Sequence, residues 1–178
     1  MKFDPIDPRR QGFPTLFLAL VLAGMAVGVP SPAVAECTEA AAPGANWRRC
    51  FHDGRIMPRV DLTGAMLRDA TFQRSDLSGS TLTNADAYRA KFVSAILNGV
   101  IFDGARLTEV DFTRADLAGA SLRNADLRAA RLVNADLRKA NLTGARLDRA
   151  DLRNAELAGA IWTDGVKVCA EGSVGQCN

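Results

Sequence analysis

The sequence has little net charge and a single histidine, and both features restrict the chemistry of the protein. Lysine and arginine number 22 and aspartate and glutamate 20, so we expect no strong field toward nucleic acid or a membrane surface. The sequence contains one histidine, His52, and no phosphate loop, spaced metal-ligand cluster or nucleophile elbow. We therefore expect no enzymatic activity, no catalytic residue, no metal and no cofactor.

Long hydrophobic runs are also scarce. One occupies residues 15–29, after a basic N-terminal stretch, and it is short for a bilayer span, which needs about 20 apolar residues. Ala33 and Ala35 form the small-x-small pattern of a cleavage site. We predict a secretory signal peptide over residues 1–35, cleaved after Ala35, and a periplasmic or secreted protein. A transmembrane anchor is the alternative, and Arg9-Arg10 leaves the twin-arginine route open.

The sequence is rich in a five-residue repeat. Centres that recur every five positions from Leu62 to Trp162 are Leu or Phe in 19 of 21 cases, the exceptions being Ala87 and Trp162. Alanine lies two positions before the centre in 16 of these 21 pentads. Three looser pentads extend the pattern back to Ala45. A period of five fits neither a helix nor a long strand, so each pentad indicates a short extended side followed by a corner. Such sides close into stacked coils of a solenoid.

Features that recur every 20 residues indicate four sides per coil. Phe72, Phe92 and Phe112 share one of the four pentad classes, and from Leu62 onward the corner glycines fall only in the classes of Leu77 and Leu82. Charges alternate in sign at the same step in three columns: Lys91, Asp111, Arg131 and Asp151; Asp86, Arg106, Asp126 and Arg146; and Arg49, Asp69, Arg89 and Glu109. Opposite charges about 4.8 Å apart on adjacent coils attract. The expected fold class is all-β, a quadrilateral β-helix of about six 20-residue coils.

The pentads ADLAG, ADLRA, ADLRK, ANLTG and ADLRN resemble those of the pentapeptide-repeat family, whose motif is A(D/N)Lxx. The resemblance covers residues 45–164 and implies that the β-helix is right-handed. The flanking segments resemble the cysteine-bearing ends of exported members. We expect a signal peptide over 1–35, an N-terminal cap segment over 36–44, the β-helix over 45–164 and a cysteine-bearing C-terminal cap over 165–178.

We expect an exported structural or protein-interaction module that binds an unidentified protein or forms a homodimer. Some family members mimic DNA and occupy type II topoisomerases, which gives quinolone resistance, and this role is the alternative. It needs an acidic cytoplasmic rod, whereas this chain is near neutral and has an export signal. Arginines and acids interleave on the side of Leu67, so we expect a self-neutralised ladder and no nucleic-acid binding.

Four outward carboxylates share one column and are the only candidates for a cation site in the repeats: Asp76, Asp116, Asp136 and Glu156. Arg138 is adjacent, and an acid before the centre is the repeat's own signature. His52 occupies an inward centre, which is typical of a core or capping residue. Ala87 leaves open whether the core contains a void or a local bend.

The cysteines lie in two pairs at opposite ends of the repeats. Because a disulfide needs Cα atoms about 4.4–6.8 Å apart, the predicted length of the rod selects Cys37–Cys50 and Cys169–Cys177 from three pairings. We also expect Trp47 and Trp162, at the first and last centres, to plug the bore.

One outward apolar group is the candidate docking surface. Ile96 and Ile101 occupy positions where the repeat usually places a polar residue, and Val93 lies just before them. Exposed apolar side chains on a flat, weakly charged surface are typical of contact sites, although single surface isoleucines are common.

Overall fold

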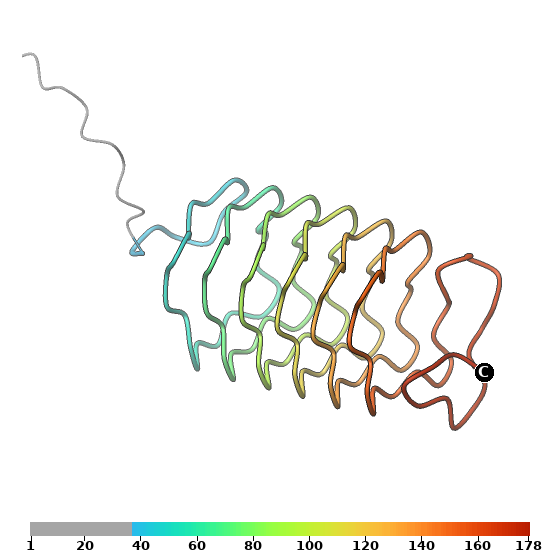
Figure 1. Ribbon diagram of the computed structural model, residues 1–178. Helices are drawn as coiled ribbons and strands as arrows, with labels where there is room; N and C mark the ends of the chain where they lie inside the picture. Colours follow the sequence, from blue (N-terminus) through green and yellow to red (C-terminus); the bar gives the residue numbers. More distant parts are fainter. Residues whose placement is uncertain (1–36) are drawn as a thin grey trace, which may run out of the picture. The chain divides into compact units, whose positions relative to one another are not determined.

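The protein is described here by a computed structural model that covers residues 37–178, so the predicted signal peptide lies outside the described residues. Within this part the chain winds into a stack of coils that progresses along one axis (Figure 1). It contains no α-helix, and its β-structure consists of single bridge residues separated by two-residue turns. No helix in residues 37–178 is long and apolar enough to cross a bilayer.

Backbone pairing joins residues that lie 20 apart in the sequence. Parallel bridges run from Asn46↔Met66 to Asn141↔Ile161, and each has this offset. The N–H of a centre residue donates to the following coil, as from Leu82 to the carbonyl of Ile101 at 2.7 Å. The 20-residue spacing at which charges and phenylalanines recur in the sequence is therefore the spacing of the bridged positions on neighbouring coils.

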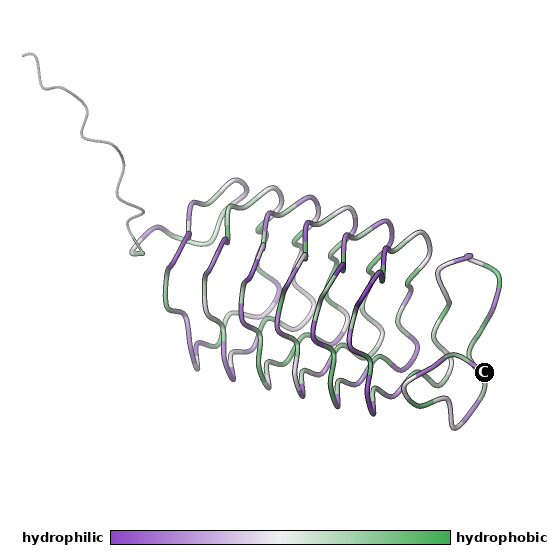
Figure 2. Ribbon diagram, in the orientation of Figure 1, coloured by the Kyte–Doolittle hydropathy of each residue, from purple (hydrophilic) through white to green (hydrophobic). Residues whose placement is uncertain are grey.

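Two residues of each pentad point inward and exclude water from the bore. One column consists of fully buried side chains, as the sequence predicts: Leu82, Phe102, Leu122 and Leu142. Ala87 is also fully buried. Figure 2 shows apolar and polar residues interspersed along every coil, as expected when inward and outward residues alternate. Burial of each Leu or Phe contributes about 1.5–3 kcal/mol, which offsets the entropy lost on ordering the chain.

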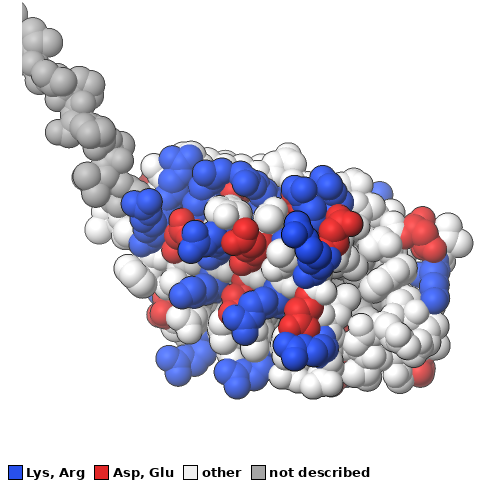
Figure 3. Space-filling view, viewed as in Figure 1, with Lys and Arg blue, Asp and Glu red and all other residues white. Residues whose placement is uncertain are grey.

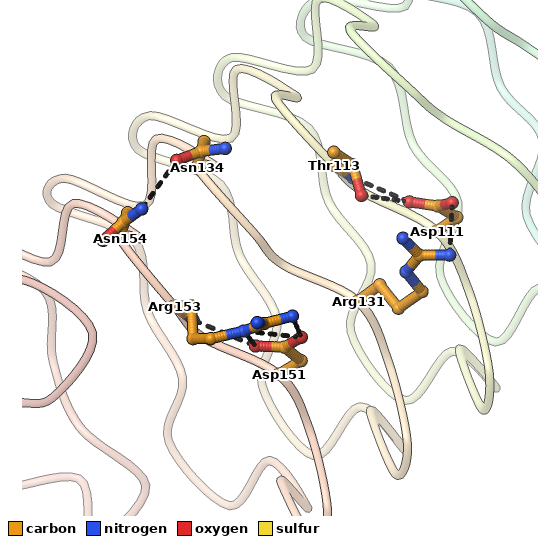
Figure 4. Close-up of polar contacts among 7 residues, drawn as sticks. All are labelled: Asp111, Thr113, Arg131, Asn134, Asp151, Arg153 and Asn154. Carbon is orange, nitrogen blue, oxygen red and sulfur yellow. Dashed lines mark hydrogen bonds and ion pairs between the residues drawn. The ribbon is translucent and has the colours of Figure 1, made fainter.

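The acidic residue before the centre starts the turn. The Oδ1 atom of Asp111 accepts hydrogen bonds from the backbone N–H of Thr113 at 3.0 Å and from its hydroxyl (Figure 4). Asp116 accepts the N–H of Ala118 in the same way. This local side-chain to backbone bond is the reason that Asp or Asn recurs at this position of the repeat.

The corner residue of every pentad from that of Trp47 to that of Leu157 adopts a positive φ whether or not it is glycine. Arg74 has φ 55° and Ala129 also 55°, beside Gly104 at 66°. The positive φ is therefore a property of the corner position and does not depend on glycine. Gly104 has an additional reason, since a Cβ atom there would lie 2.5 Å from Oδ1 of Asn84 on the preceding coil.

Both ends of the β-helix carry a short covering segment. At the N-terminal end, Gly44 donates its N–H to the carbonyl of Thr63 at 2.8 Å. At the C-terminal end the chain reverses and forms antiparallel bridges, Glu156↔Val174 and Ile161↔Val168. Trp47 is buried, as expected for a plug. Trp162 is only half-buried, and at this end the reversed C-terminal segment covers the last coil together with it.

Candidate interaction surfaces

The interior is filled by a continuous aromatic stack. Phe72 and Phe92 lie 4.9 Å apart between ring centroids and nearly parallel, and Phe112 continues the stack at 5.3 Å. Phe102 packs edge-on against Phe92 at 5.9 Å from another side of the coil. The predicted phenylalanine ladder is therefore present, and it occupies the space that a bound cofactor would need.

His52 extends this stack toward the N-terminal end. Its ring lies 5.1 Å from Phe72 and 4.1 Å from Trp47, and its side chain is fully buried. Neither ring nitrogen has a hydrogen-bond partner. Burial, aided by the charge of Arg55, lowers the pKa of His52 from 6.5 to about 4, so the ring is neutral at pH 7. It is a packing residue of the core.

The four carboxylates proposed as a cation site have other partners. Arg138 donates from Nε to Asp136 at 2.9 Å and lies 3.3 Å from Glu156, and its guanidinium lowers the pKa of Asp136. Asp76 and Asp116 accept turn N–H groups. Among residues 37–178, no group of three or more His, Cys, Asp or Glu side chains is placed to hold a metal ion.

Outward charges pair along the axis of the coils. Arg131 reaches Asp111 on the preceding coil at 3.7 Å, as Figure 4 shows, and Arg89 reaches Asp69 at 3.5 Å. On the face seen in Figure 3, basic and acidic side chains are intermixed. Each exposed pair contributes at most about 1 kcal/mol. Their main effect is to neutralise the surface locally.

Tyr88 is surrounded by three arginines on the side of the coil that contains Leu67. The guanidinium carbons of Arg68, Arg89 and Arg106 lie 5.8, 5.9 and 5.0 Å from its ring centroid. Arg68 also donates to Asp86 at 2.7 Å. These arginines therefore have partners within the protein, as expected for a self-neutralised ladder.

The proposed apolar patch is only partly continuous. Ile96 is 45% exposed and Ile101 38% exposed, on adjoining sides of one coil, whereas Val93 is half-buried on the preceding side. Three valines of the C-terminal cap are also exposed, Val166, Val168 and Val174. Within the repeats the prediction omitted two exposed residues, Phe51 at 75% and Ile56 at 79%. Both occupy the outward position before a centre in the looser first pentads, CFHDG and RIMPR, so the same rule would have found them.

The structure joins the cysteines in the two predicted pairs. The Cα atoms lie 5.4 Å apart in Cys37–Cys50 and 4.9 Å apart in Cys169–Cys177. No free cysteine is present. Each disulfide closes a short loop within one end segment, which restricts the unfolded chain and holds the cover in place.

The repeat matches a known family. The sequence profile described as "Pentapeptide repeats" matches in overlapping copies between residues 54 and 161. The chain belongs to the pentapeptide-repeat family. The prediction of this family from the pentads is confirmed, and with it a right-handed β-helix of the kind that structural and protein-interaction modules use.

Solved structures of other pentapeptide-repeat proteins resemble this chain to different degrees. HetL, described as involved in heterocyst differentiation regulation in the cyanobacterium Nostoc sp. strain PCC 7120, is 36% identical with a TM-score of 0.58. The match covers 68% of this chain and 61% of HetL. A trypsin-treated variant of QnrB1, a plasmid-mediated fluoroquinolone resistance protein, is 21% identical over 67% of this chain and 64% of its own, with a TM-score of 0.38.

A third structure comes from the thylakoid lumen of Arabidopsis thaliana. It is 19% identical, with a TM-score of 0.31, over 73% of this chain and 85% of its own. A search of curated proteins finds no significant match. The chain spans less than two thirds of the length of HetL and of the trypsin-treated QnrB1 variant.

The buried histidine predicts a pH-dependent stability. Because the pKa of His52 is about 4 in the folded protein and 6.5 when unfolded, the unfolded chain binds the proton more strongly. Stability present above pH 6.5 should fall by about 3 kcal/mol as the pH drops to 4. His52→Phe should extend the aromatic stack and remove most of this loss, measured by urea unfolding between pH 7 and 4.

A core variant that keeps the histidine is the control. Phe92→Leu should be less stable at every pH, but its unfolding free energy should depend on pH as steeply as that of the wild type. The carboxylate of Asp126, whose pKa is lowered to about 2 mainly by its hydrogen bond from Arg128, loses its contribution only below about pH 4. If the unfolding free energy of His52→Phe fell with pH as steeply as that of the wild type, a group other than His52 would be responsible for the loss.

Proposed function

We propose that this protein is an exported, non-catalytic module that presents a rigid surface to a protein partner or to a second copy. The observation that carries the proposal is the pair of disulfides at the two ends, since such bonds persist in oxidising compartments. Residues 1–35 are the proposed signal peptide, and residues 36–44 and 165–178 are the proposed caps.

The proposed shape is a quadrilateral rod of about six coils between these caps. Four bridge positions in each 20 residues support four sides, and the bridged region supports the proposed limits of 45–164. Leu, Phe and Ala side chains fill the bore, and outward acids hold turns or pair with arginines. Chemistry would therefore have to occur on a surface whose polar groups are already engaged, which favours binding over catalysis.

The alternative, a DNA mimic directed at a type II topoisomerase, is less well supported. Mimicry of a phosphate backbone requires rows of unpaired negative charge. Here the acidic columns contain arginines at neighbouring positions, as between Asp111 and Arg131. The near-neutral charge of the chain and its proposed oxidising compartment both favour a partner other than a topoisomerase.

The proposed export to an oxidising compartment predicts the form of the purified protein. When the full-length chain is expressed with a C-terminal tag, intact-mass spectrometry of the exported fraction should show a chain that begins at Glu36. Its mass should be lower by four hydrogens because both disulfides are formed. A cytoplasmic, uncleaved product with four free thiols would contradict this address and would favour the topoisomerase-directed role.

The docking surface is tested by charge insertion. Ile96→Asp combined with Ile101→Asp should keep the fold, because both side chains point outward. Loss of two buried apolar contacts should weaken binding of a partner captured from the exported fraction roughly a hundredfold, measured by titration of the purified pair. Val166→Asp, at an exposed position of the C-terminal cap, is the matched control. Unaltered affinity in the double variant would exclude this surface.

A further inference from the structure

The N-terminal end of the β-helix is covered on only part of its perimeter. Residues 37–44 lie over the sides that contain Asn46 and Thr63. The N–H of Asn46 donates to the Glu39 carboxylate at 2.8 Å, and the N–H of Gly44 to the carbonyl of Thr63 at 2.8 Å. The sides that contain Phe51 and Ile56 receive no such cover from the described residues.

These two sides carry unpaired backbone groups. In the next coil the residue at the same position donates backward, as Thr71 does to the carbonyl of Cys50 at 2.9 Å. Within residues 37–178 the N–H groups of Phe51 and Ile56 have no acceptor. The carbonyls of Phe51, Asp53, Ile56 and Pro58 likewise receive no donor from this part of the chain. Such an edge is a template for pairing with another chain.

The same edge carries exposed apolar side chains. Phe51 is 75% and Ile56 79% exposed, more than Ile96 or Ile101. Pro58, which has no N–H to leave unpaired, lies beside them, as is typical of an edge. Apolar side chains next to unpaired backbone are costly to expose to water and are typical of a contact surface.

The C-terminal end is different. Its reversed tail pairs with Glu156 and Ile161 and so covers two sides of the last coil. A second copy approaching head-to-tail would meet this tail rather than an open edge. The two ends therefore disfavour a continuing filament and favour a closed pair in which both copies use the same surface.

We propose that the N-terminal edge, residues 51–58, binds the same edge of a second copy in a head-to-head dimer. A two-fold axis through the corner at Gly54 lays the side of Phe51 antiparallel to the side of Ile56 of the second copy. In that register the N–H of Phe51 faces the carbonyl of Pro58, and the N–H of Ile56 faces the carbonyl of Asp53. Each of these groups is unpaired in the single chain.

The side chains are self-complementary in the same register. Phe51 lies beside Pro58 of the second copy and diagonally near its Ile56, within the reach of an aromatic ring. The Asp53 carboxylate accepts the N–H of Gln73 in the next coil at 2.8 Å and so lies away from the edge, which leaves the contact to the backbone and to the apolar side chains. The cap segment keeps the remaining two sides apart, so the contact is small. We expect association at roughly 10–100 µM, at the weak end for protein interfaces.

Sedimentation equilibrium over about 5–500 µM tests the dimer. The wild-type protein should pass from monomer to dimer, whereas Phe51→Asp with Ile56→Asp should remain monomeric at every concentration with an unchanged thermal midpoint. The Ile96→Asp, Ile101→Asp variant should dimerise like the wild type, so failure of the proposed docking surface and failure of this edge are distinguishable. A monomeric wild type, or a dimer that survives the Phe51 and Ile56 changes, would overturn the proposal.

A cross-link tests the symmetry. Because all native cysteines are paired, Arg55→Cys introduces a single thiol close to the proposed two-fold axis. Under mild oxidation it should form disulfide-linked dimers at least tenfold faster than Arg114→Cys, which places a thiol at an equivalent corner three coils away. Equal rates for the two variants would show that the copies do not meet head-to-head.

Discussion

Every coil depends on backbone hydrogen bonds that pair positions 20 residues apart with those of the neighbouring coils. The chain has no helix or long strand among residues 37–178 in which to satisfy its peptide groups locally. Each pentad instead sends N–H groups to both neighbouring coils, as Leu82 does to Ile101 and Thr81 to Val60. Side chains at equivalent positions must then stack, so the interior becomes columns of Leu and Phe, and in three exterior columns the stacked charges alternate in sign.

The same constraint explains why both ends need covers. A ladder that runs along one axis leaves unpaired donors and acceptors at its first and last coils. At the C-terminal end, antiparallel segments held by Cys169–Cys177 pair with two sides. At the N-terminal end, the segment tied by Cys37–Cys50 leaves the sides of Phe51 and Ile56 open. The head-to-head dimer proposed for this end is thus a consequence of the incomplete cover that the described residues provide.

Much of the fold followed from the sequence because its repeat has no insertion. The period places Leu82 and Phe102 in one column without reference to distant contacts, and the charges of Asp111 and Arg131 mark the offset. Corner geometry was harder to predict. Arg74 and Ala129 adopt positive φ because backbone hydrogen bonds on both sides of the corner outweigh a local cost of about 1 kcal/mol, which residue type alone does not reveal.

The candidate surface was predicted less well than the core. The repeat encodes which residues point outward, such as Phe51 and Ile56, but it does not encode how far neighbouring coils and end segments cover each of them. Val93 is half-buried while Phe51 is exposed, although both are apolar and outward on the same side of the rod. His52 is a polar residue that is buried, because it occupies an inward centre and packs between the rings of Trp47 and Phe72.

Deletion of repeats tests the 20-residue register most directly. Removal of residues 105–124 takes out one whole coil and leaves every later side above its original column. Removal of residues 105–114 deletes half as much chain, but it turns all later sides to the opposite face of the rod. The 20-residue offset predicts that the longer deletion lowers the thermal midpoint less than the shorter one. An equal or greater loss in the longer deletion would contradict this account of the fold.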